Sequence, residues 1–224
     1  MRRLLPPELT RPATAVAVLC FAATAALGVA VAGGTAEGPW DAAAFDALDR
    51  LYGALPGVVE PVSLTTNPVV MIGLLVVIAA VALVRGRPEV ALLAAVGPAL
   101  AAGVNTWLLK PLFGRTHDDY LAYPSGHTTT FVSIMAVLTL VISANAPPGR
   151  RVIRTVTTAG VSFVLFAVAA SAIVELRYHY LSDTLGALSW AVGAVITVAA
   201  VIDRCTRRTR AARQPAVAHT TVAE

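Results

Sequence analysis

Residues 110–127 read KPLFGRTHDDYLAYPSGH, and they form the one long polar stretch in a chain that is otherwise mostly apolar. This stretch holds the single lysine of the chain, Lys110, and two of its four histidines, His117 and His127. A second, shorter polar stretch follows at residues 175–183 and reads ELRYHYLSD. We expect the two stretches to meet on one side of a membrane and to bind a phosphate there.

The composition is that of a membrane protein. The chain has 224 residues, of which 57% are hydrophobic and 13% are charged, whereas soluble domains carry about 25% charged residues. A helix that crosses a bilayer needs about 20 mostly apolar residues. Six runs meet this requirement: 13–33, 66–84, 89–109, 127–145, 155–174 and 184–202. The sequence therefore predicts an all-α, integral membrane six-helix bundle that forms a single domain over residues 1–224.

Three segments carry further features. The first apolar run follows several arginines and could be a cleaved signal peptide, but its length favours an uncleaved helix. Residues 34–65 alternate aspartates with apolar residues at helical spacing. That pattern leaves open an amphipathic helix on the membrane surface or a solvated connector. Residues 204–224 are basic and then polar, and we expect a disordered cytoplasmic tail.

The basic residues are distributed unevenly along the chain. With the amino terminus in the cytoplasm and six spans, 13 of the 17 basic residues face the cytoplasm. Such an excess fixes the orientation of a multi-pass protein. The outer exceptions are Arg50, Lys110, Arg115 and Arg177. We therefore expect a plasma membrane protein, in a bacterial inner membrane, with both termini cytoplasmic and both polar stretches outside. The basic residues cluster beside the apolar runs, which also argues against nucleic acid as a partner, despite the net charge of +4.

The end of the first polar stretch, Pro124-Ser125-Gly126-His127, has the features of an anion site at a helix start. Ser125 can cap the helix that follows by accepting from its free backbone N–H groups. Those N–H groups attract anions, and Gly126 allows an oxyanion to approach the backbone closely. His127 would then lie in the first helical turn, able to donate a proton. The alternative is a plain capped helix with an interfacial histidine.

The second stretch places His179 four residues before Asp183. On a helix this spacing puts both on one face, where the carboxylate could fix the imidazole tautomer. A structural hydrogen bond or a surface pair is the other interpretation. Two ligands alone do not make a metal site, and we expect no metal or other cofactor.

The chain resembles the type 2 phosphatidic acid phosphatase (PAP2) family. The resemblance lies in the order of its motifs on a six-helix membrane chain: lysine and arginine, then Pro-Ser-Gly-His, then His-x-x-x-Asp. Members of the family are integral-membrane, metal-independent lipid phosphatases related to vanadium haloperoxidases, and the resemblance covers roughly residues 66–202. It implies that His179 attacks phosphorus, that Asp183 orients it and that His127 protonates the leaving alcohol. The phosphate ligands that it implies are Lys110, Arg115, Ser125, Gly126 and Arg177.

The chain departs from the family pattern at two positions. The first family motif is Lys-x6-Arg-Pro, but His117 stands at the arginine position, and Arg115 comes two residues early. The Ser-Arg pair of the third motif is replaced by Ala172-Ile173, and Arg177 comes four residues late. We expect Arg177 to bind the phosphate in place of the arginine of the third motif, with His117 as a further candidate ligand.

The resemblance implies a lipid phosphate phosphatase that works through a phosphohistidine intermediate. The substrate would be a phosphomonoester or diphosphate of a membrane lipid, with a polyprenyl phosphate or diphosphate favoured over a phosphatidic acid-like lipid. Two alternatives stay open. One is a lipid phosphotransferase with the same site, and the other is a non-catalytic anion-binding or transport membrane protein.

Overall fold

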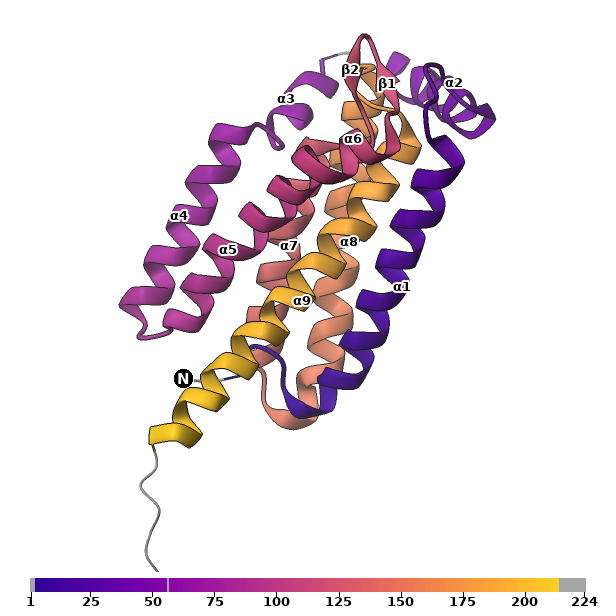
Figure 1. The fold of residues 1–224 in the computed structure, drawn as a ribbon. Helices are drawn as coiled ribbons and strands as arrows, with labels where there is room; N and C mark the ends of the chain where they lie inside the picture. Colours follow the sequence, from indigo (N-terminus) through magenta and orange to yellow (C-terminus); the bar gives the residue numbers. More distant parts are fainter. Residues whose placement is uncertain (1–2, 56, 214–224) are drawn as a thin grey trace, which may run out of the picture.

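Prolines begin four of the helices, where the fixed φ angle suits the first helical position and the missing N–H costs nothing. These four are α1 (Pro7–Val31), α2 (Pro39–Gly53), α4 (Pro68–Val84) and α5 (Pro88–Val104). The computed structural model describes residues 3–55 and 57–213 (Figure 1). The other long helices are α7 (Gly126–Asn145), α8 (Arg151–Glu175) and α9 (Leu181–Arg213).

The six predicted apolar helices are all present as α1, α4, α5, α7, α8 and α9. Five of them are long and apolar enough to cross a membrane, whereas α4 is apolar but has only 17 residues. The chain is therefore a multi-pass membrane protein. One boundary differs from the expectation: α9 continues to Arg213, so residues 204–213 are helical and not a disordered tail. Arginine and alanine are strong helix formers, which explains the extension, and residues 214–224 lie outside the described part.

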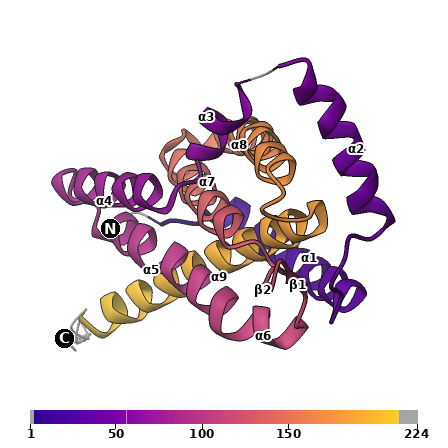
Figure 2. The ribbon, with the colours of Figure 1, turned by 90° about the horizontal axis from the view of Figure 1, so that it is seen from above.

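Two helices organise the bundle. Helix α7 packs against α4, α5, α8 and α9, and α9 also packs against α1 and α5. Seen along the bundle, α7 lies near the middle and α2 lies at the edge (Figure 2). Most of the buried contacts are made by alanine, valine, leucine and isoleucine side chains. Small alanines let helices approach closely, which is how membrane helices associate.

The polar stretches and most of the short elements gather at one end of the bundle (Figure 1). The short elements at this end are α3 (Val59–Leu64), α6 (Lys110–Phe113), β1 (Thr116–His117) and β2 (Tyr120–Leu121), whereas η2 (Pro148–Arg150) lies at the other end of α7. Strands β1 and β2 form an antiparallel hairpin. A π-helical segment, η1 (Asn105–Leu109), joins α5 to α6. Such wide turns often occur at functional sites, and this one comes directly before Lys110.

Helix α2 forms within the segment for which two interpretations were open. Its apolar face packs against α8 and α9, with Phe45 and Tyr52 buried. Trp40 on another face is 84% exposed. The segment therefore contains a helix whose buried face contacts the protein, and its place on the membrane surface stays a prediction.

Candidate active site

The amino-terminal end of α7 is built as the sequence predicts. Ser125 is the N-cap, and its hydroxyl accepts from the backbone N–H of Thr128 at 3.4 Å. Gly126 and His127 are the first two helical residues. Asn105 of η1 supports this turn from behind, because its amide donates to Thr129 Oγ1 at 2.9 Å and to the Ser125 carbonyl at 3.4 Å. The first N–H groups of a helix lack helical partners, so this end of α7 can bind an anion.

His179 and Asp183 are close together, although not on one continuous helix. Helix α9 begins at Leu181, so His179 precedes it and Asp183 lies in its first turn. The expectation that one helical turn carries both residues is therefore wrong. Their proximity comes from the bend at the helix start, which leaves His179 Nδ1 3.6 Å from Asp183 Oδ2. The same Oδ2 accepts from the backbone N–H of Tyr180 at 3.1 Å.

The surroundings of His179 favour its neutral form. Burial lowers the pKa of the imidazole, and the nearby Lys110 and His117 lower it further, whereas Asp183 raises it. The net pKa of His179 lies below the ordinary value for histidine. A neutral imidazole keeps a lone pair on one ring nitrogen. His179 can therefore act as a nucleophile near neutral pH.

His127, His179 and Lys110 line one cavity of about 420 Å³. The two imidazole rings lie 6.2 Å apart, measured between their centroids. A second cavity of about 460 Å³ adjoins the first, and both are lined by Thr66, Pro68, Tyr120, His127 and His179. Gly126 also lines the first cavity, and Ile173 lines the second. The site therefore combines two histidines, a primary amine and a free helix start around one space.

Both terminal nitrogens of Arg115 bind carboxylates. Its Nη2 lies 2.6 Å from Asp41 Oδ2, and its Nη1 lies 2.8 Å from Asp183 Oδ1. The guanidinium also lies over the ring of Tyr180, 4.1 Å from the centroid. Arg115 is only 2% exposed and does not line either cavity. The structure therefore brings Arg115 to Asp183 and not to the space between the histidines.

Arg177 and His117 also lie away from the two cavities. Arg177 Nη2 donates to both carboxylate oxygens of Asp49, at 2.9 and 2.8 Å, and the guanidinium stacks on Phe45 at 3.8 Å. The ring of His117 packs on Tyr180, with 4.5 Å between centroids. Neither residue lines either cavity. Within residues 3–55 and 57–213, Lys110 is the only lysine or arginine that lines them.

Asp41 is a site residue that the sequence interpretation missed. It is 3% exposed, and it accepts from the backbone N–H and the hydroxyl of Ser182, at 2.9 and 2.8 Å, as well as from Arg115. Burial opposes ionisation, but these hydrogen bonds outweigh it and hold the pKa of Asp41 below its usual range. One feature of the sequence could have indicated that Asp41 is buried and paired. Asp41 is four residues before Phe45 and therefore lies on the apolar face of α2, where an unpaired carboxylate would be costly.

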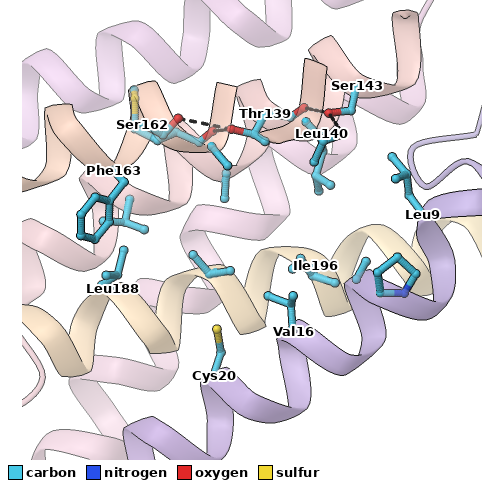
Figure 3. Close-up of a pocket in the computed structure, with 18 of the residues that line it drawn as sticks. Leu9, Val16, Cys20, Thr139, Leu140, Ser143, Ser162, Phe163, Leu188 and Ile196 are labelled. Atoms are coloured by element: carbon cyan, nitrogen blue, oxygen red, sulfur yellow. Dashed lines mark hydrogen bonds between the residues drawn. The ribbon is translucent and has the colours of Figure 1, made fainter. Parts of the chain in front are cut away.

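A separate apolar cavity of about 460 Å³ lies between α1, α7, α8 and α9 (Figure 3). Its polar lining consists mainly of hydroxyls that already donate to helix carbonyls, such as Thr139 to Met135 and Ser143 to Thr139. None of its lining residues lines the cavities at His127. Across the described residues, no group of three or more His, Cys, Asp or Glu side chains is arranged to hold a metal.

The fold and the site define a multi-pass helical membrane protein with a histidine–carboxylate site at one end. The family model described as the PAP2 superfamily matches residues 69–207, so the chain belongs to that superfamily. As a member of that superfamily, it is an integral-membrane phosphatase.

A solved structure supports the fold. The chain is similar to the crystal structure of a transmembrane PAP2 type phosphatidylglycerolphosphate phosphatase from Bacillus subtilis, at 16% sequence identity and a TM-score of 0.65. The match covers 84% of this chain and 96% of that one. Comparison with curated proteins finds no significant match.

Proposed function

We propose that the protein hydrolyses a phosphate ester or diphosphate of a membrane lipid through a phosphohistidine intermediate on His179. Nε2 of His179 attacks phosphorus. Asp183, which lies 3.6 Å from Nδ1 in this structure, moves closer to accept a hydrogen bond from Nδ1–H and stabilises the developing imidazolium. The bond from phosphorus to the leaving oxygen breaks, and His127 gives that oxygen a proton. His127 then takes a proton from water, which attacks the phosphohistidine and releases inorganic phosphate.

One observation carries this proposal: two imidazoles line the same cavity, and only one of them has a carboxylate behind it. The ring of His179 has Asp183 3.6 Å from Nδ1, which suits a nucleophile that becomes cationic. His127 lies at the helix start instead, and no carboxylate of the described residues holds its ring, which leaves it free to exchange a proton with the leaving group. This asymmetry supports the proposal that the two histidines have different roles.

The phosphoryl oxygens would be held by Lys110 and by the backbone N–H groups around Gly126. Both residues line the cavity, and fixed donors of this kind stabilise the charge on a transferring phosphoryl group. Ser125 contributes by capping the helix start. The phosphate-binding roles of Arg115, Arg177 and His117 stay predictions, and in this conformation both arginines bind carboxylates.

The substrate is a lipid because the site lies at the end of a membrane-spanning bundle and opens onto apolar walls. Pro68 and Ile173 line the cavities beside the histidines, and both are apolar. We favour a polyprenyl phosphate or diphosphate, with phosphatidic acid-like lipids as the second class. The similar Bacillus subtilis protein is a phosphatidylglycerolphosphate phosphatase, so that lipid belongs in the same test.

The test is phosphate release from a panel of lipid phosphates, in detergent and with excess EDTA. We expect activity to persist with the chelator and to be blocked by vanadate, which mimics the five-coordinate phosphoryl group. Activity that disappears with EDTA and returns with a divalent ion would contradict the metal-independent mechanism. Phosphate transfer to an added alcohol, with no release to water, would favour the phosphotransferase instead.

We also propose that the site faces the outside of the cell. The proposal rests on the asymmetry of the basic residues and predicts labelling of a cysteine at position 118 by an impermeant thiol reagent in intact cells. The side chain of Asp118 is 80% exposed at the tip of the hairpin, so a cysteine there is accessible. The background variant lacks Cys20 and Cys205.

Gly149→Cys provides the matched control for this labelling experiment. Gly149 lies in the connection between α7 and α8, and nothing lies within 4 Å of a side chain added there. We expect this cysteine to react only after lysis. The reverse pattern, with position 149 labelled in intact cells and position 118 protected, would overturn the orientation.

A further inference from the structure

A row of buried charges connects α2 to the proposed nucleophile. Asp41 binds one end of the Arg115 guanidinium at 2.6 Å, and Asp183 binds the other end at 2.8 Å. Asp183 in turn lies 3.6 Å from His179 Nδ1. We infer that Asp41 and Arg115 are positioning residues for the reaction, acting through Asp183 without touching the substrate. The inference rests on the proposed phosphohistidine chemistry.

Both terminal nitrogens of Arg115 are occupied. Each terminal nitrogen already binds a carboxylate, and Nη1 also donates to the Ser182 hydroxyl at 2.5 Å. Its Nε is buried without a partner. A phosphate could bind the terminal nitrogens only by displacing Asp41 or Asp183. Since that would leave a buried carboxylate unpaired, it would be strongly unfavourable.

The contacts around Asp183 fix both of its oxygens. Oδ1 accepts from Arg115 at 2.8 Å, and Oδ2 accepts from the Tyr180 N–H at 3.1 Å while facing His179. Asp41 holds the adjacent residue, Ser182, by its backbone N–H and its hydroxyl. Helix α2 therefore fixes the start of α9, and with it the orientation of the carboxylate behind the nucleophile.

The network also sets the charge that His179 experiences. With neutral His179, the three ionised groups Asp41, Arg115 and Asp183 carry a net charge of −1. The other titratable groups around the His179 ring come from four further elements. They are Lys110 of α6, His117 of β1, Tyr120 of β2 and His127 of α7.

The acid limb is the pH range, on the acid side of the pH–activity profile, over which activity falls. Neutralising Arg115 and neutralising Asp41 should move this limb in opposite directions. Removing the Arg115 charge leaves two carboxylates beside His179, which favours the imidazolium and raises its pKa. Removing the Asp41 charge leaves Arg115 neutralised by Asp183 alone, which disfavours the imidazolium and lowers its pKa. Since only neutral His179 attacks, the first change moves the limb to higher pH and the second moves it to lower pH.

The experiment measures kcat and KM against pH for the wild type, Arg115→Gln and Asp41→Asn, with one lipid phosphate. We expect the limb of kcat/KM to move by about 0.5 to 1 pH unit, upward for Arg115→Gln and downward for Asp41→Asn. We also expect kcat to fall by about 10²-fold in each because the nucleophile is less well oriented. KM should stay within about threefold of the wild type, since no contact with the substrate is lost.

The matched controls are Arg87→Gln and Glu89→Gln. Glu89 is a buried carboxylate, 3% exposed, and Arg87 binds it at 3.1 Å at the opposite end of the bundle. These variants remove an ion pair of the same type without changing the charge near His179. We expect both to lose some thermal stability and to keep the acid limb of the wild type.

Each remaining outcome has a distinct meaning. A large rise in KM for Arg115→Gln, with an unmoved limb, would show that Arg115 binds the substrate phosphate and would overturn the positioning role. Limbs that move in the same direction, or not at all, would also overturn it. Full activity of His179→Ala would instead reject the proposed function itself, so the two failures can be told apart.

Discussion

His179→Ala should abolish turnover, with a loss of at least about 10⁴-fold in kcat/KM. The variant has no nitrogen that can form the bond to phosphorus, and no other imidazole in the cavity has a carboxylate behind it. Asp183→Asn should lose less, about 10²-fold, because the nucleophile remains but its orientation and its stabilisation as a cation suffer. The measurement is phosphate release from the best lipid phosphate, beside a thermal unfolding curve for each variant.

Direct detection of the intermediate makes this prediction sharper. Wild-type protein mixed with a radiolabelled lipid phosphate and quenched in alkali should carry label that acid removes, as expected of phosphohistidine. His179→Ala should carry none, although it binds the same lipid. Label that persists in His179→Ala, or label that resists acid, would place the covalent step on another residue.

His127→Ala should reduce kcat/KM for alkyl phosphates by about 10² to 10⁴-fold, the usual contribution of a positioned general acid. An alkoxide is a poor leaving group and needs the proton that His127 supplies. The aryloxide of an aryl phosphate with an electron-poor ring leaves without a proton, so the loss of kcat/KM for this substrate should be much smaller. The measured quantity is the ratio of kcat/KM values for the two substrates, in the variant and in the wild type.

The choice of kcat/KM matters because His127 is also proposed to activate the water in the second step. A slower second step would lower kcat for both substrates equally. The ratio kcat/KM reports only on events up to the first irreversible step, so it does not include this effect. The aryl phosphate therefore serves as the internal control for folding and for phosphate binding. If both substrates lost kcat/KM equally, His127 would have to be removed from the acid role.

The positions of Arg115 and Arg177 show that spacing along the sequence does not predict which groups a charged side chain binds. Both lie in the polar stretches beside the histidines, and the resemblance to the PAP2 family predicted that both bind phosphate. The structure pairs Arg115 with Asp41 and Asp183, and Arg177 with Asp49. Two of these three carboxylates belong to α2, a segment that is more than 60 residues away in the sequence. No local pattern encodes pairings over that distance.

The sequence by itself determined the membrane helices, the cap at Ser125 and the two histidines of the site. Apolar runs and helix-start residues act locally, through hydrophobic burial and through backbone hydrogen bonds within a few residues. Only the tertiary structure decided which charges face the cavity. Buried carboxylates need partners wherever the chain supplies them, so Asp41 binds Arg115 and, in the described part of the chain, leaves Lys110 as the cation beside His127 and His179.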